Sequence, residues 1–212
     1  MPFNSISKPI KDVLVITPSV FQDERGFFKE TFKSSYLKAI GIDSQFKQDN
    51  ESWSRKGILR GLHYQLDPMS QGKMVHVTIG SVYDVAVDLR RGSQTFGKWV
   101  SEILTATNHK IFWIPPGFAH GFYALEDSFL SYKSTNEYSK EHESGIIWND
   151  PRLDIQWPSS SPILNEKDKK WGDFESASIN FQYKINNLFL HPEVIDDPGQ
   201  ESNNAKRFGH RE

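Results

Sequence analysis

Short apolar runs, each ended by glycine, proline or another turn residue, constrain the fold of this chain more than any other feature of its sequence. The runs are rich in valine, isoleucine and aromatic residues, and such runs between turn residues are typical of β-strands. Many short strands in succession predict a mainly β fold, either a sandwich or a barrel. The expected strands span residues 13–17, 57–65, 73–79, 82–89, 99–104, 110–114, 121–125 and 129–135.

One short helix is expected near the front of the chain. Residues 31–40 predict it, with Ser34 or Ser35 as its N-cap and Gly41 as its end. Serine at the start and glycine at the end satisfy the backbone groups that a helix leaves unpaired.

The sequence changes character from about Trp148, where tryptophan, proline and serine replace the strand pattern. We expect loops that cover the body of the protein, with one helical turn over 167–171. No repeat and no linker interrupts the first 165 residues, so we expect a single domain over 1–185. Residues 186–212, rich in proline, asparagine and charge, predict a poorly ordered tail.

Composition excludes several function classes. The 212 residues contain no cysteine, which rules out disulfides and thiolate metal ligands and is consistent with a cytoplasmic location. The net charge is −2 with acids and bases well mixed, so bulk charge does not favour nucleic acid as a partner. No apolar stretch approaches the ~18 residues needed to cross a bilayer, and the N-terminus has no signal-peptide pattern. We expect a soluble protein with no membrane partner.

Residues 82–89 alternate so that two acids share one face of an otherwise apolar strand. Asp84 and Asp88 lie on the same side as Val82 and Ala86. This face is therefore expected to be either a polar lining or an exposed side.

Arg60 and His63 are three residues apart in one expected strand. In a regular strand they would point to opposite faces, so only a bulge or bend at Gly61 would let both line one cavity. The plainer interpretation is a histidine at the edge of the core and an arginine on the surface, and these residues alone favour it.

Other polar side chains stand out by their positions. A rigid turn over 115–122 presents His120 between small residues, which fits a functional histidine as well as an incidental one. Lys73 begins an expected strand, where a lysine is usually solvated. His76 is out of phase with Lys73, and we expect it to be structural or exposed. Tyr132 lies in an apolar strand, where a buried hydroxyl needs a partner.

A metal site among His63, His76 and His120 is disfavoured. Metal-binding cupins often present two histidines one residue apart on a strand, followed by an acid and a later histidine. The residue two positions beyond His63 is Gln65, so that pair is missing. We expect no metal.

Taken together, these segments resemble the dTDP-4-dehydrorhamnose 3,5-epimerase family from about Val13 to Asp168, which is most of the chain. The motifs occur in order and at family-like spacing. They occupy residues 21–28, 48–50, 59–65, 71–73, 84–90, 95–97, 114–122, 148–151 and 167–168.

The resemblance implies a cupin-like jelly-roll β-barrel, a homodimer, and no metal or organic cofactor. It also implies roles: His63 as the catalytic base, Asp168 as the acid that pairs with it, Tyr132 as the proton donor and Lys73 as the cation near the ketone oxygen. Tyr138 would stack on the thymine base. The full set of expected substrate contacts is Arg25, Glu30, Gln48, Asp49, Asn50, Arg60, His120, Tyr138, Glu143 and Lys167.

The implied reaction inverts C3 and C5 of dTDP-4-dehydro-6-deoxy-D-glucose and gives dTDP-4-dehydro-L-rhamnose, a step of dTDP-L-rhamnose biosynthesis. Both carbons flank one ketone, so one base, one opposed donor and one cation at the shared oxygen serve both. The alternatives are a 3- or 5-monoepimerase acting on a related 4-keto nucleotide sugar, a metal-dependent cupin enzyme, and a non-catalytic sugar-binding cupin. The fold alone does not decide between them.

Overall fold

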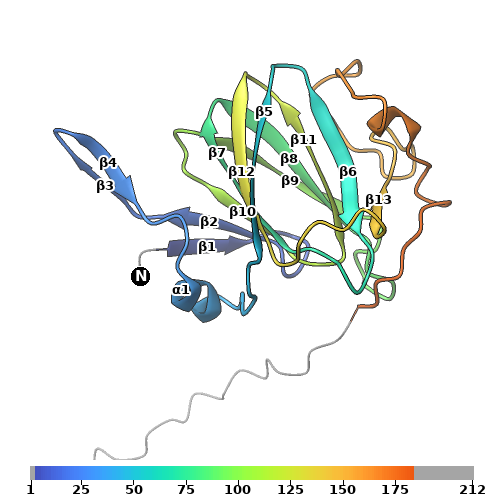
Figure 1. The fold of residues 1–212 in the computed structure, drawn as a ribbon, viewed down its shortest axis with the longest axis horizontal. Coiled ribbons are helices and arrows are strands. Elements are labelled where there is room, and N and C mark those ends of the chain that lie inside the picture. The colour runs from blue at the N-terminus through green and yellow to red at the C-terminus, as the bar shows by residue number, and fades with distance from the viewer. Residues whose placement is uncertain (1–2, 184–212) are drawn as a thin grey trace, which may run out of the picture.

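Two antiparallel β-sheets face each other in the computed structural model, which describes residues 3–183 (Figure 1). Many neighbouring strands are far apart in the sequence, as in a jelly roll. The six-stranded sheet contains, in spatial order, β1 (Phe3–Ser7), β2 (Leu14–Pro18), β10 (Ile111–Ile114), β7 (Lys73–Ile79), β12 (Ser128–Ser134) and β5 (Gln48–Ser54). The five-stranded sheet contains β13 (Glu143–Gly145), β6 (Leu59–Gln65), β11 (Phe118–Ala124), β8 (Ser81–Asp88) and β9 (Trp99–Thr105).

Three smaller elements lie outside the two sheets. A hairpin of β3 (Val20–Asp23) and β4 (Gly26–Lys29) projects away from the barrel (Figure 1). The only α-helix in residues 3–183 is α1 (Ser34–Ala39), and a 3₁₀ turn, η1 (Asp168–Lys170), lies near the end of the described chain. The predicted mainly β fold with a short N-terminal helix is confirmed.

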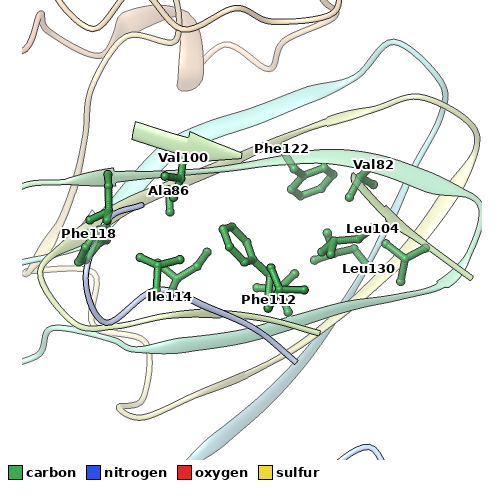
Figure 2. Close-up of a cluster of buried hydrophobic side chains, with 14 residues drawn as sticks. Val82, Ala86, Val100, Leu104, Phe112, Ile114, Phe118, Phe122 and Leu130 are labelled. Carbon is green, nitrogen blue, oxygen red and sulfur yellow. The ribbon is translucent and has the colours of Figure 1, made fainter. Parts of the chain in front are cut away.

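The main core fills the space between the sheets (Figure 2). Phe112 and Leu130 come from the six-stranded sheet, and Val82, Ala86 and Phe122 face them from the other. Burying a side chain such as Phe112 stabilises the fold by roughly 2 kcal/mol. This packing fills much of the space between the two sheets.

The alternation of β8 is as expected. Val82 and Ala86 belong to the core between the sheets, whereas Val85 and Val87 belong to a second cluster beneath the C-terminal segment. Asp84 shares the inner face and is fully buried. Of the two predicted possibilities for this face, the polar lining is therefore correct.

The segment that follows β13 covers the five-stranded sheet (Figure 1). Trp99 of β9 attaches it, because its Nε1 donates to the carbonyl oxygen of Leu153 at 2.9 Å. Within the segment, Trp157 Nε1 donates to the carbonyl oxygen of Trp148 at 2.8 Å. The predicted covering loops and helical turn are confirmed. The predicted tail over 186–212 lies outside the described residues.

Two local predictions differ from the structure. Ser34 and Ser35 lie inside α1, and the N-cap is Lys33, which makes no capping side-chain bond, so the predicted serine cap is wrong. The pattern also missed β5, because this strand is polar on both faces. Alternate residues of β5 line the barrel interior next to a cavity, while the others face solvent, so no apolar stripe forms. Within residues 3–183, no helix has the length and apolar character needed to span a membrane.

Candidate active site

A polar cavity of about 180 Å³ lies between the two sheets. Its walls come from five strands, β5, β6, β7, β11 and β12, so residues distant in sequence meet there. The cavity is lined by Ser52, Arg60, His63, Lys73, His120, Phe122, Leu130 and Tyr132.

A bulge places both Arg60 and His63 in this cavity. The pairing of β6 with β11 shifts register between His120 and Phe122, beside Gly61. Gly61 has φ +138°, and a Cβ there would lie 2.6 Å from the Cα of Gly121, so the strands can approach only without side chains. The structure has the bend at Gly61 that a shared cavity requires, so the favoured interpretation of Arg60 as a surface residue is wrong.

His63 pairs with a buried carboxylate. Its Nε2 lies 2.6 Å from Oδ1 of Asp168, whose side chain is fully buried. Burial by itself raises the pKa of Asp168, but contacts with His63, the Gly61 N–H and Trp171 outweigh it and lower the value. The ionised carboxylate can only accept a hydrogen bond, so His63 Nε2 carries the proton. In a neutral imidazole held this way, the other ring nitrogen has the free lone pair and can act as a base.

A second histidine–aspartate pair lies in the same cavity. His120 Nε2 is 2.9 and 3.0 Å from the two carboxylate oxygens of Asp84. Burial raises the pKa of Asp84, although the charges of His120 and Lys73 oppose this. Burial likewise lowers the pKa of His120, opposed by Asp84. Asp84 was not among the expected site residues, and its only signal was its place on the polar face of β8.

Lys73, the first residue of β7, brings a cation to the cavity. Burial lowers its pKa to about 8, against the attraction of Asp84 and Glu143. An ammonium with this pKa is still mainly charged at pH 7 and is easily influenced by negative charge that develops nearby. Its Nζ lies 5.9 Å from the centre of the Tyr132 ring.

Tyr132 faces the cavity from the sheet opposite to His63. Burial raises its pKa, and the charge of Arg60 opposes this only in part, so the phenol holds its proton at neutral pH. Arg60 itself is held by Ser54 Oγ at 2.9 Å and by the carbonyl oxygen of Trp53 at 2.8 Å. The cavity thus contains an imidazole on one wall and a proton-bearing phenol on the other.

A polar network joins the remaining expected contacts. The Tyr138 hydroxyl donates to Glu143 Oε2 at 2.7 Å, and Glu143 also forms an ion pair with Lys167. The Tyr138 backbone N–H donates to Gln48 Oε1 at 2.7 Å, and Gln48 Nε2 donates to Asn50 Oδ1 at 2.6 Å. Tyr138 is 54% exposed, which leaves its ring available to stack on a planar ligand.

Of the expected substrate contacts, only Arg60 and His120 line the cavity itself, and three others lie outside both the cavity and the network around Tyr138. Arg25 pairs with Asp23 on the projecting β3–β4 hairpin, where both are exposed. Glu30 follows that hairpin. Asp49 lies on the exposed outer face of β5, where it forms an ion pair with Lys133 at 2.7 Å. No group of three or more metal-ligating side chains is assembled anywhere in residues 3–183.

The comparisons with known proteins agree with this geometry. Residues 7–176 match the family model for dTDP-4-dehydrorhamnose 3,5-epimerase. The chain belongs to the dTDP-4-dehydrorhamnose 3,5-epimerase family. A family member from Shigella flexneri is 52% identical over 176 residues, which cover 82% of this chain and 97% of that protein.

Solved structures give the same result. A dTDP-6-deoxy-D-glucose-3,5-epimerase from Legionella pneumophila, solved in complex with dTDP-4-keto-L-rhamnose, has a TM-score of 0.82 and 44% identity, covering 86% of this chain and 99% of that chain. A dTDP-4-dehydrorhamnose 3,5-epimerase from Sulfolobus tokodaii has a TM-score of 0.80 and 46% identity, covering 86% and 100%. The cupin-like barrel that the resemblance implied is confirmed, and the chain is a nucleotide-sugar epimerase by family.

Proposed function

We propose that this chain inverts C3 and C5 of dTDP-4-dehydro-6-deoxy-D-glucose and produces dTDP-4-dehydro-L-rhamnose for dTDP-L-rhamnose biosynthesis. One observation carries the proposal: His63 and Tyr132 line one cavity from opposite sheets. A ring held between them has a base on one face and a proton donor on the other. Removal of a proton from one face and its return from the other inverts a carbon.

His63 is the base in this mechanism. A C–H bond beside the ketone breaks, its proton passes to the imidazole, and its electron pair delocalises onto the ketone oxygen as an enolate. Asp168 orients the imidazole and stabilises the imidazolium, as the aspartate of a hydrolytic triad does. Histidine suits the task because its ordinary pKa of about 6.5 lies near working pH.

Tyr132 and Lys73 complete the step. The enolate carbon takes a proton from the Tyr132 hydroxyl on the opposite face, and solvent then restores the phenol and removes the proton from His63. Lys73 stabilises the enolate oxygen, and loss of one such preorganised donor typically costs about 3 kcal/mol of transition-state stabilisation. Protons alone move, so the reaction requires neither a redox cofactor nor a metal.

The nucleotide part of the substrate occupies the network around Tyr138. Its exposed ring stacks on thymine, while Gln48, Asn50, Glu143 and Lys167 provide polar contacts around it. Arginine side chains suit the diphosphate because a guanidinium pairs with its oxygens through two donors. Arg60 is within the cavity, and Arg25 is the second candidate.

A homodimer explains how Arg25 would reach a substrate. The β3–β4 hairpin projects from its own barrel (Figure 1), and its Phe21, Phe27 and Phe28 are 60%, 56% and 65% exposed. Exposed aromatic side chains on a projecting hairpin are suited to bury against a second copy of the chain. In that arrangement Arg25 serves the partner's cavity. We propose that the enzyme works in the cytoplasm as a dimer of single-domain subunits.

Isotope exchange tests the proposed function. Incubation with dTDP-4-dehydro-6-deoxy-D-glucose in deuterated water should place deuterium at both C3 and C5 and yield the L-rhamno product. Label at only one carbon would indicate a monoepimerase, and no label would refute the proposal. Loss of activity on treatment with a chelator, with recovery on adding metal, would instead indicate a metal-dependent enzyme.

A further inference from the structure

Trp171 lies beside the His63–Asp168 pair, and the proposed mechanism does not use it. It directly follows η1, which begins at Asp168. The centre of its ring system is 6.3 Å from that of the His63 ring, with the planes at 65°, an edge-to-face arrangement. The Ile147 N–H donates to the carbonyl oxygen of Gly172 at 2.8 Å, which fixes the chain directly after the indole.

Gly145 makes room for this indole. It is the partner of His63 in the pairing of β13 with β6. A Cβ on Gly145 would lie 2.7 Å from Trp171 Nε1, well inside van der Waals contact. The missing side chain therefore lets the indole pack directly against the strand pair that carries the base.

The indole N–H is buried and has no regular hydrogen-bond partner among the described residues. Buried donors are almost always paired, because an unpaired one destabilises the fold. The nearby acceptor is Asp168: burial raises the pKa of this carboxyl, but His63, the Gly61 N–H and the Trp171 indole lower it. Asp168 Oδ1 is occupied by His63, and Oδ2 receives only a long contact of 3.4 Å from Gly61 N.

We propose that Trp171 is a positioning residue for the epimerisation: its indole packs against His63 and offers its N–H to the Asp168 carboxylate, which keeps the imidazole aimed at the sugar. The inference rests on the proposed function of His63 as base. No bond to Trp171 forms or breaks during the reaction. The indole holds the carboxylate from a second side while the imidazole gains and loses its proton.

Several charged and titratable groups besides Trp171 influence this pair. They face His63 from six elements of the fold and remain unchanged in the test below. They are Arg60 on β6, Lys73 on β7, His120 on β11, Tyr132 on β12, Glu143 on β13, and Lys167 at the N-cap of η1.

Trp171→Phe tests the inference, because it keeps an aromatic ring and removes the N–H. We expect kcat to fall about tenfold while KM stays within about twofold, since only the orientation of the base changes. The acid limb of the kcat/KM profile should move to higher pH, because Asp168 without the indole is more basic and favours the protonated imidazole.

Trp157→Phe is the matched control: it also removes an indole N–H from the covering segment, one that donates to Trp148.

Gly145→Ala provides a second test that leaves Trp171 in place. The new methyl group would displace the indole, so this variant should reproduce the lower kcat and the shifted acid limb. Near-ultraviolet circular dichroism would show that each variant is folded. Wild-type kcat and acid limb in either folded variant would overturn the inference. Absence of deuterium exchange in the wild-type enzyme would instead refute the proposed function, and this inference with it.

Discussion

His63 Nε2 and Asp168 Oδ1 lie 2.6 Å apart although 105 positions separate the two residues in the chain. The contact joins the five-stranded sheet to the C-terminal covering segment, so that segment contributes to the site as well as to the core. Its carboxylate determines which imidazole nitrogen is free to accept a proton.

Replacement of His63 and of Tyr132 should damage different steps. His63→Ala should abolish exchange of solvent deuterium into C3 and C5, because it removes the proposed base while His120, the other histidine of the cavity, stays paired with Asp84. Tyr132→Phe should reduce inversion more than exchange, since proton removal still occurs. Nuclear magnetic resonance of substrate and product in deuterated water measures both. Exchange at the wild-type rate in His63→Ala would remove His63 from the mechanism.

Asp168 should make stability depend on pH in the acid range. Contacts with His63 and neighbouring donors lower its pKa from the ordinary value of 3.8, despite the opposing effect of burial. The ionised carboxylate is therefore favoured in the folded state, and its contribution is complete above the unfolded value and lost as pH falls through the folded one.

Asp168→Asn isolates this contribution. Urea unfolding of the wild type and the variant should show a difference in the free energy of unfolding that is larger at pH 6 than at pH 3. The variant should also lose kcat by about 10⁴-fold, because the amide favours the wrong imidazole tautomer. A difference in unfolding free energy that is constant with pH would contradict the assignment of the ion pair.

The sequence predicted most strands of the two sheets, because strands depend on local pattern, but it left open whether the acids of β8 face inward and did not favour a bend at Gly61. It did not predict β5, since a strand that lines a polar cavity has no apolar stripe. The meeting of His63 with Asp168 could be stated only from the family resemblance, because contacts across 105 residues have no local signature. The role of Asp84 also escaped prediction, since its partner His120 lies on another strand.

Lys73 should limit activity on the alkaline side. Burial lowers its pKa to about 8, so the ammonium that stabilises the enolate is lost above that pH and kcat should decline. Lys73→Met should lower kcat by about 10²-fold or more with little change in KM, in line with loss of a preorganised donor. Lys73→Arg remains charged in this pH range. If kcat of this variant still declines above about pH 8, a group other than Lys73 causes the decline.

The same lysine should destabilise the folded protein. Its folded pKa lies below the ordinary 10.5, so the charged form is disfavoured by folding, and the free energy of unfolding should rise between pH 8 and 10.5. Lys73→Met removes this cost and should be more stable than the wild type at pH 7, although it is nearly inactive. Chemical denaturation at pH 7 and pH 10 checks the sign, and a less stable variant at pH 7 would contradict it.

The final prediction concerns Arg25 and the proposed dimer. Arg25→Ala and His63→Ala should each be nearly inactive as homodimers. If the hairpin of one subunit serves the cavity of the other, a mixed dimer contains one complete site: the barrel of the Arg25→Ala chain with the hairpin of the His63→Ala chain.

Random reassociation of the two variants should therefore restore about a quarter of wild-type activity, because half of the dimers are mixed and each has one complete site of two. If Arg25 acted in its own barrel, each mixed dimer would contain two defective sites and mixing would restore nothing. Titration of one variant against the other, with activity measured at each ratio, distinguishes the two cases. Mixing His63→Ala with Tyr132→Phe is the matched control: both residues line the same barrel, so no combination of subunits yields a complete site.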